Sequence, residues 1–191
     1  MPLIAGHISE RRLQAMADAA GRASLTYDEV GATAEELPPG FRHGRFAIDL
    51  GSLPETFERA GKGLLRWEAH RFAGATIRPD QPPLEAGCSQ LVVLRLGGMT
   101  MVAPTRTVYV TDEPDRFGFA YGTLAGHPES GEEAFHITRG IDNAVRFEIV
   151  VFWRPSAVLA RLGAPVSKVV QARVTKRYLL GIKAYVDRFA T

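Results

Sequence analysis

The stretch PVSKVVQARVTKRYLLGIKAYVDRF, residues 165–189, carries the strongest periodic signal in the chain and decides the fold. Its large apolar residues recur at intervals of three and four positions, the spacing that places side chains on one face of an α-helix. These residues are Val166, Val169, Val170, Val174, Tyr178, Ile182, Tyr185, Val186 and Phe189. We therefore expect a long amphipathic C-terminal helix whose apolar face packs on another element.

The sequence before this helix predicts a run of β-strands between residues 75 and 154. Alternating or short continuous apolar segments mark the strands. They occupy residues 76–78, 91–96, 105–111, 116–123, 133–138 and 145–153. The connections are short, with Gly97-Gly98 typical of a hairpin and residues 126–131 typical of a turn. Consecutive strands should therefore pair antiparallel.

Two helices and one more strand are predicted upstream of that run. Residues 9–21 have helical spacing, and residues 46–50 alternate with the period of a strand. Ser52 and Glu55 have the spacing of a capping box, which predicts a helix that runs to about Phe72.

The helix expected before residue 72 contains two glycines and a tryptophan–histidine pair. Gly61 and Gly63 each weaken it by about 1 kcal/mol relative to alanine, and close approach of a neighbouring element would account for them. Trp67 and His70 lie three positions apart and are therefore neighbours on the helix surface. In one interpretation they line the mouth of a pocket. In the other, Trp67 belongs to the core and His70 is partly exposed.

The order of elements predicts an α+β fold. A strand and a helix are followed by several antiparallel strands and then by the long helix. A curved sheet with one apolar face needs a cover, and one amphipathic helix can provide it. We therefore expect a helix-grip arrangement, in which a curved antiparallel sheet wraps around the C-terminal helix and a pocket lies between them. Residues 27–191 should form this single domain, and residues 1–26 an N-terminal helical extension.

The composition is that of one folded domain and excludes several classes of protein. The 191 residues are 46% hydrophobic and 23% charged, with a net charge of +2. Cys88 is the single cysteine, which excludes a disulfide framework and a multi-cysteine zinc site. We recognise no cofactor motif, no metal-ligand set and no stretch of about 20 apolar residues that predicts a membrane-spanning helix. Since no secretory signal pattern is recognisable either, the expected location is the cytoplasm.

The predicted C-terminal helix is basic, although the whole chain is nearly neutral. Residues 166–191 contain six basic residues and one acidic residue, so this segment carries +5 and the remainder −3. Such a face is usually solvated. The alternatives are weak peripheral contact with an anionic membrane and docking on a protein partner. No aromatic residues are interleaved with these charges, so nucleic acid is not an expected partner.

Four short motifs resemble one family of bacterial and plant proteins. They are Leu37-Pro38-Pro39-Gly40-Phe41, Arg66-Trp67 with His70, Gly118-Phe119-Ala120-Tyr121-Gly122-Thr123-Leu124, and His127-Pro128-Glu129-Ser130-Gly131-Glu132-Glu133-Ala134-Phe135. On these residues the chain resembles the domain-of-unknown-function family numbered nineteen-ninety, which looks related to the START-like superfamily of polyketide cyclases and lipid-transport proteins. The resemblance implies the helix-grip fold. It implies no established reaction, so it assigns no catalytic residue.

Strand alternation places two charged residues on faces that are otherwise apolar. Arg106 shares its face with Val108 and Val110, and Glu133 shares its face with Phe135. If both faces point inward, the two charges must pair or meet a polar ligand, because an unpaired buried charge is costly. The alternatives are a structural ion pair and the opposite strand parity, which leaves Arg106 in water. With that parity, the inward residues are Thr105, Thr107 and Tyr109.

The turn that contains His127 supplies the candidate catalytic residues. A histidine titrates near neutral pH, so His127 could exchange protons together with Glu132 or Glu133. The alternative is a histidine that orders the loop through a hydrogen bond to the backbone or to a carboxylate.

A set of aromatic and charged residues forms the candidate ligand-binding site. The set consists of Trp67, Arg106, Phe119, Tyr121, Glu133, Phe135, Trp153 and Tyr178. Aromatic side chains line most small-molecule pockets, and a few polar groups anchor the ligand in them. The alternative is that the aromatic residues fill a packed core.

Three functions follow from these features, in order of preference. The first is a binding module for a small hydrophobic or amphipathic molecule. The second is an enzyme of the cyclase, isomerase or hydrolase type that uses acid–base residues in the same cavity. The third is an interaction protein that docks through its basic C-terminal helix. The sequence alone assigns neither a reaction nor an oligomeric state.

Overall fold

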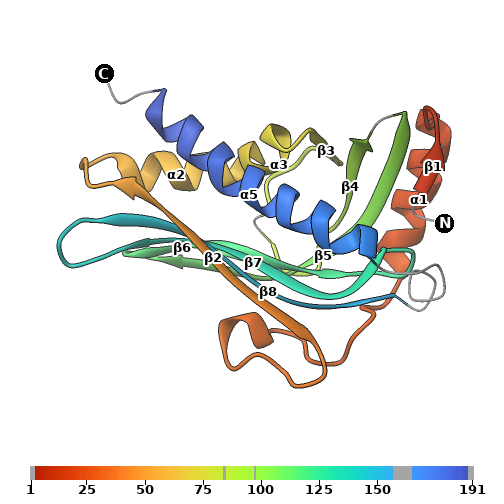
Figure 1. Ribbon diagram of the computed structural model, residues 1–191, viewed down its shortest axis with the longest axis horizontal. Helices are drawn as coiled ribbons and strands as arrows, with labels where there is room; N and C mark the ends of the chain where they lie inside the picture. The colour runs from red at the N-terminus through yellow and green to blue at the C-terminus, as the bar shows by residue number, and fades with distance from the viewer. Residues whose placement is uncertain (1–2, 84, 97, 157–164, 189–191) are drawn as a thin grey trace.

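Eight antiparallel strands form one curved sheet, and the long helix α5 crosses one of its faces (Figure 1). The computed structural model describes residues 3–83, 85–96, 98–156 and 165–188. The strand order is β2–β8–β7–β6–β5–β4–β3, and β1 pairs with β5 outside this path. The helices are α1 (Glu10–Arg22), the 3-10 helix η1 (Ala32–Ala34), α2 (Thr56–Leu65), α3 (Glu68–Phe72) and α5 (Pro165–Asp187). The strands are β1 (Leu3–Ala5), β2 (Arg42–Gly51), β3 (Ala75–Arg78), β4 (Ser89–Leu96), β5 (Met99–Glu113), β6 (Arg116–Thr123), β7 (Glu129–Arg139) and β8 (Val145–Pro155).

The predicted curved antiparallel sheet and the C-terminal helix that covers it are confirmed. Every strand expected between residues 75 and 154 is present, and all pair antiparallel with their neighbours. The turn expected at residues 126–131 is shorter than predicted, because β7 already begins at Glu129. Gly97 and Phe189, which belong to the predicted hairpin and helix, lie outside the described residues.

The face of the sheet that α2, α3 and α5 cover, called the inner face below, holds the main core. Helix α5 contributes Tyr178, Ile182 and Val186 to it. The close approach expected at the two glycines of α2 is confirmed. A Cβ on Gly63 would lie 2.9 Å from the Tyr185 ring. These contacts fix the C-terminal half of α5 against α2.

The helix expected from Ser52 to Phe72 begins later and breaks in two. Its N-cap is Glu55, without a side-chain capping bond, so the capping box was wrong. Between α2 and α3, Trp67 adopts a left-handed backbone conformation with φ of 58°. A bulky residue rarely takes this conformation. Here it turns the chain so that the Trp67 ring is buried against His70 and Phe119.

The opposite face of the sheet, the outer face, is covered by α1 and by the connector at residues 23–41. Leu13 and Ala20 of α1 pack on Leu91 and Val93 of β4. The connector follows α1 and lies beneath the sheet in the view of Figure 1. A bridge between Leu25 and Leu124 joins it to the residue that follows β6.

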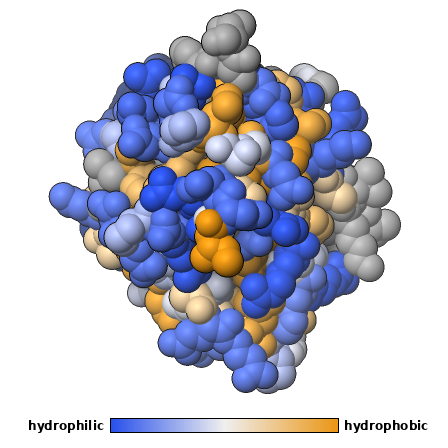
Figure 2. All heavy atoms as spheres, turned by 90° about the vertical axis from the view of Figure 1, so that its left-hand side faces the viewer, coloured by the Kyte–Doolittle hydropathy of each residue, from blue (hydrophilic) through white to orange (hydrophobic). Residues whose placement is uncertain are grey.

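The end of the molecule that carries the β7–β8 turn and the β2–α2 connection is mostly hydrophilic (Figure 2). Ile141 and Leu53 are the strongly exposed apolar side chains near these two connections. Among the described residues, no helix is both long and apolar enough to cross a membrane.

Candidate functional site

The inner face changes from apolar to polar toward one end of the strands. Across β5, β6, β7 and β8, one row of directly opposed residues is apolar: Val110, Phe119, Phe135 and Ile149. The adjacent row contains Thr107, Tyr121, Glu133 and Val151. The row after that contains Gln90, Thr105 and Thr123 on β4, β5 and β6, then Trp153 and Arg42 on β8 and β2. We call Arg42, Gln90, Thr107, Tyr121, Glu133 and Trp153 the inner polar cluster.

A chain of hydrogen bonds runs from α3 to β7 at the border between these two halves. Tyr121 Oη donates to Glu133 Oε2 over 2.9 Å. His70 Nε2 lies 3.1 Å from the same hydroxyl oxygen. Since the Tyr121 proton points at the carboxylate, the imidazole is the donor in the second bond. The His70 ring is buried, and burial lowers its pKa to about 3, so the imidazole stays neutral.

The Glu133 carboxyl group titrates near neutral pH. Loss of water contact raises its pKa to about 7, the bond from Tyr121 opposes this rise, and nearby Glu129 adds to it. Burial also raises the pKa of Tyr121 and of Tyr178, whose hydroxyl groups interact. Both phenols therefore remain protonated, while Glu133 can exchange a proton under physiological conditions.

Four members of the inner polar cluster present buried polar atoms that lack a hydrogen-bond partner among the described residues. They are Gln90 Nε2, Thr107 Oγ1, Trp153 Nε1 and Arg42 Nη1. Glu133 itself is only half-buried, although it points toward the helix side of the sheet. An unpaired buried polar group costs about 1–3 kcal/mol. This half of the inner face is therefore unlike a finished core, in which nearly all such groups are paired.

Glu132, the residue before Glu133, lies on the outer face and is fully engaged. Its carboxylate accepts hydrogen bonds from the Tyr27 hydroxyl and the Gly31 N–H at 2.7 and 2.8 Å. It also accepts them from the Thr33 N–H and hydroxyl. Because each of these donors belongs to the connector, Glu132 fixes the connector to the sheet.

The structure does not bring the three candidate catalytic residues together. Glu132 and Glu133 point to opposite faces of β7. His127 accepts a hydrogen bond from the Glu129 N–H at its Nδ1 over 2.9 Å. Burial lowers the pKa of His127 to about 4, so it is a neutral residue that orders the turn. Only Glu133 retains the geometry of a catalytic candidate.

Arg106 also lies on the outer face, so the expectation that it shares an interior with Glu133 is wrong. Its guanidinium donates to the Ser89 hydroxyl and to the carbonyl oxygens of Ala20 and Gly21. It therefore binds the C-terminal end of α1. The reason is a β-bulge at Val108, which shifts the pairing of β5 with β6.

Because of the bulge, the opposite strand parity, with the threonines and Tyr109 facing inward, holds for only part of β5. Thr105 and Thr107 are buried on the inner face, as that alternative has it. Tyr109, beyond the bulge, turns to the outer face, where its hydroxyl is hydrogen-bonded to that of Thr33.

The aromatic candidates divide between core and cluster. Trp67, Phe119, Phe135 and Tyr178 make edge or stacked ring contacts with one another or with His70 and are buried. Tyr121 and Trp153 face the polar half of the inner face. His70, for which one interpretation of the sequence predicts partial exposure, is buried. The break in the helix at Trp67 rotates α3, and the sequence pattern does not indicate that break.

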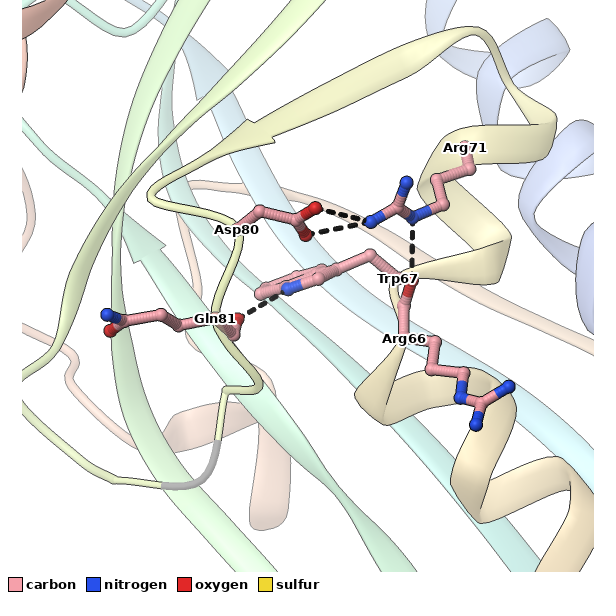
Figure 3. Close-up of polar contacts among 5 residues, drawn as sticks. All are labelled: Arg66, Trp67, Arg71, Asp80 and Gln81. Carbon is pink, nitrogen blue, oxygen red and sulfur yellow. Dashed lines mark hydrogen bonds and ion pairs between the residues drawn. The ribbon is translucent and has the colours of Figure 1, made fainter.

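A shallow surface pocket of about 310 Å³ lies where α2 and α3 meet the loop after β3. Arg71 donates to both carboxylate oxygens of Asp80, and Trp67 Nε1 donates to the Gln81 carbonyl oxygen (Figure 3). Arg71 also donates to the Arg66 carbonyl oxygen. These bonds hold the loop against the helix break and engage the Arg71 and Asp80 side chains with each other.

The basic face of α5 is partly engaged within the molecule. Arg177 donates to the Phe72 carbonyl oxygen and lies over the Phe72 ring. Lys183 pairs with Asp187. Arg173 and Lys176 are exposed.

Comparisons with known proteins agree with this architecture. The family model "Domain of unknown function (DUF1990)" matches residues 26–180. A UPF0548 protein of Deinococcus radiodurans is 32% identical over 166 residues, which cover 80% of this chain and 83% of that protein. A UPF0548 protein of Arabidopsis thaliana is 30% identical over 154 residues, which cover 78% of this chain and 75% of that protein.

Solved structures resemble the fold at low sequence identity. The hypothetical protein jhp0584 from Helicobacter pylori superposes with a TM-score of 0.57 at 12% identity, covering 85% of this chain and 96% of that one. The Zhui aromatase/cyclase from a Streptomyces species gives 0.55 at 15% identity, covering 79% of this chain and 96% of that one. The structural matches show the fold alone, a helix grip, and the sequence matches show that the chain belongs to the DUF1990 (UPF0548) family.

Proposed function

We propose that this protein binds a small amphipathic molecule between the inner polar cluster and the N-terminal half of α5. The C-terminal half of α5 is packed on phenylalanine rings. The N-terminal half of α5 lies over the other end of the sheet, where the polar half of the inner face lies (Figure 1). The site is thus apolar at one end and polar at the other.

The unpaired polar atoms of the inner polar cluster carry this proposal. Gln90, Thr107, Trp153 and Arg42 come from four different strands, and all four direct buried polar atoms to the same face. Buried polar groups are nearly always paired in folded proteins, and four of the unpaired ones among the described residues lie on this face, against two, in Arg116 and His136, on the outer face. A ligand that completes their hydrogen bonds would remove the cost.

The same atoms indicate the chemistry of the ligand. Gln90 Nε2, Trp153 Nε1 and Arg42 Nη1 are donors only. A molecule that satisfies them must supply acceptor oxygens, as a carbonyl compound or a carboxylic acid does. The Tyr121 ring and Val151 would contact its apolar body.

Binding can be tested with the fluorescent dye anilinonaphthalene sulfonate, which joins an apolar body to acceptor oxygens. We expect the wild type to bind the dye and a panel of aromatic and aliphatic ketones and carboxylic acids to displace it. Trp153→Phe removes the indole donor but keeps an apolar ring, and it should weaken dye binding about fivefold to tenfold.

The control is Trp67→Phe, since Trp67 Nε1 already donates to Gln81. Failure of the wild type to bind the dye or any member of the panel would contradict the proposal. So would equal affinity of the wild type and the Trp153→Phe variant.

A further inference from the structure

We infer that Glu133 is a general base in this site, one that removes a proton from a carbon next to a carbonyl group of the bound molecule. This inference rests on the binding proposed above and adds a reaction to it. Three observations support it. A hydrogen-bond chain fixes one oxygen of the carboxylate, the other oxygen is free of hydrogen bonds among the described residues, and unpaired donors lie nearby.

The Glu133 carboxylate has one oxygen held and the other free. Oε2 accepts the bond from Tyr121 at 2.9 Å. Among the described residues, none is hydrogen-bonded to Oε1. Since the side chain is half-buried on the inner face, this oxygen is available to a molecule bound on that face. A general base needs this combination of fixed orientation and an accessible lone pair.

Tyr121 and His70 are positioning residues for that carboxylate. Tyr121 is held between its bond to Glu133 and its contact with His70 Nε2. His70 in turn is packed against the rings of Phe135 and Tyr178. Neither side chain can move without disturbing the core, so the carboxylate is held in a single orientation.

Unpaired donors flank the base on both sides. Thr107 lies directly opposite Tyr121 on β5, and Trp153 lies diagonal to Glu133 on β8. Diagonal neighbours across antiparallel strands have side chains about 7–8 Å apart. A bound carbonyl group between them could accept a hydrogen bond from Thr107 Oγ1, Trp153 Nε1 or Arg42 Nη1 while its neighbouring carbon meets Glu133.

The step is a proton transfer that balances without a co-reactant. The Glu133 carboxylate takes the proton from the carbon, and the electron pair of the C–H bond forms a C=C bond. The π electrons of the carbonyl group move to its oxygen, and the unpaired donors stabilise the resulting enolate. If the bound molecule carries a C=C bond next to this carbon, the enolate is a dienolate, and return of the proton to the far carbon of that bond completes an isomerisation and regenerates the carboxylate.

The charges around Glu133 suit this role. It faces Tyr121 from β6, Tyr178 from α5 and Glu129 from β7, and Arg42 from β2 interacts with Glu129. His70 contributes no charge because burial keeps its pKa low. The pKa of Glu133 is raised to about 7, so the carboxylate is both available and basic near neutral pH.

The test uses nitrobenzisoxazole, a probe that any desolvated carboxylate base can open. The base takes the ring C–H proton, the C–H electrons form a nitrile, and the N–O bond breaks to release a coloured cyanonitrophenolate. We expect the wild type to accelerate this reaction and Glu133→Gln to lower the rate about a hundredfold. Glu148→Gln, on the outer face of β8, is the control and should retain the full rate.

The dye assay separates the two proposals. Equal rates for the wild type and Glu133→Gln, with dye binding intact in both, would overturn the base but not the binding site. Absence of dye binding in the wild type would overturn both.

Tyr121→Phe tests positioning through the pH profile. The rate of the wild type should rise through about pH 7 as Glu133 loses its proton. The bond from Tyr121 lowers the Glu133 pKa, so its removal should shift the rise to higher pH. A purely structural tyrosine would lower the rate without shifting the profile, and that result would contradict its role as a positioning residue.

Discussion

Glu132 and Glu133 are neighbours in sequence and opposites in structure. Glu132 points to the outer face, where four donors from the connector satisfy its carboxylate. Glu133 points to the inner face, where Tyr121 is its one described partner. A buried charge with all its bonds made holds a fold together. A buried charge with bonds left open, beside other unpaired groups, marks a place for a ligand.

The largest expected effect is the loss of Glu132. Glu132→Ala leaves the Gly31 and Thr33 N–H groups buried and unpaired, so it should lower the free energy of unfolding by about 3–5 kcal/mol. Glu133→Ala, on the other face, should cost less than about 1 kcal/mol because few bonds are lost. Urea unfolding followed by circular dichroism measures both. Equal losses in the free energy of unfolding for the two variants would contradict the difference in hydrogen bonding between Glu132 and Glu133.

A methyl group added at Gly122 tests how the connector is held on the outer face. A Cβ there would lie 2.1 Å from the Tyr27 hydroxyl and 2.8 Å from Leu25. Gly122→Ala must therefore displace Tyr27 from Glu132, and we expect a loss of about 1–3 kcal/mol in the free energy of unfolding. An unchanged midpoint of urea unfolding would show that the connector is not held in the way described.

The Glu133 carboxyl should make the stability of the protein depend on pH. The Glu133 pKa is about 7 in the folded protein against 4.5 for the free group. The folded state therefore binds more protons between these values, and its stability falls as pH rises through them. Glu133→Gln lacks this loss, so the variant should gain stability relative to wild type between about pH 5 and about pH 8. A constant difference over this range would contradict the raised pKa.

The smallest expected effect belongs to Thr107. Its hydroxyl has no described partner, so Thr107→Val should leave the free energy of unfolding within about 1 kcal/mol of wild type or raise it. Dye binding should nevertheless weaken. Thr100→Val is the matched control, because the Thr100 hydroxyl donates to the Gly6 carbonyl oxygen at 2.7 Å. This control should cost about 1 kcal/mol, and a similar cost at Thr107 would mean that its hydroxyl is paired.

Local periodicity predicted the architecture but could not predict which charges meet. The apolar spacing in α5 and the alternation in the strands are properties of neighbouring residues, so they were visible in the sequence. The bulge at Val108 adds one residue to β5 without any change in composition. It places Arg106 and Val110 on different faces, although both have the same parity in the sequence.

The site depended on two further features that no local pattern encodes. The left-handed Trp67 breaks the predicted helix and carries His70 into the core. The unpaired state of Gln90 and Arg42 depends on strands far apart in the sequence. Glu133 was a candidate because it interrupts an apolar face, which is the one signal of this site that strand alternation does contain.

Binding at the inner polar cluster can be tested by a crystal structure of the protein as purified, refined to high resolution. We expect continuous electron density between α5 and the sheet. This density should lie within hydrogen-bonding distance of Gln90 Nε2, Thr107 Oγ1 and Trp153 Nε1. Side chains that fill this space and pair these atoms with one another would contradict it.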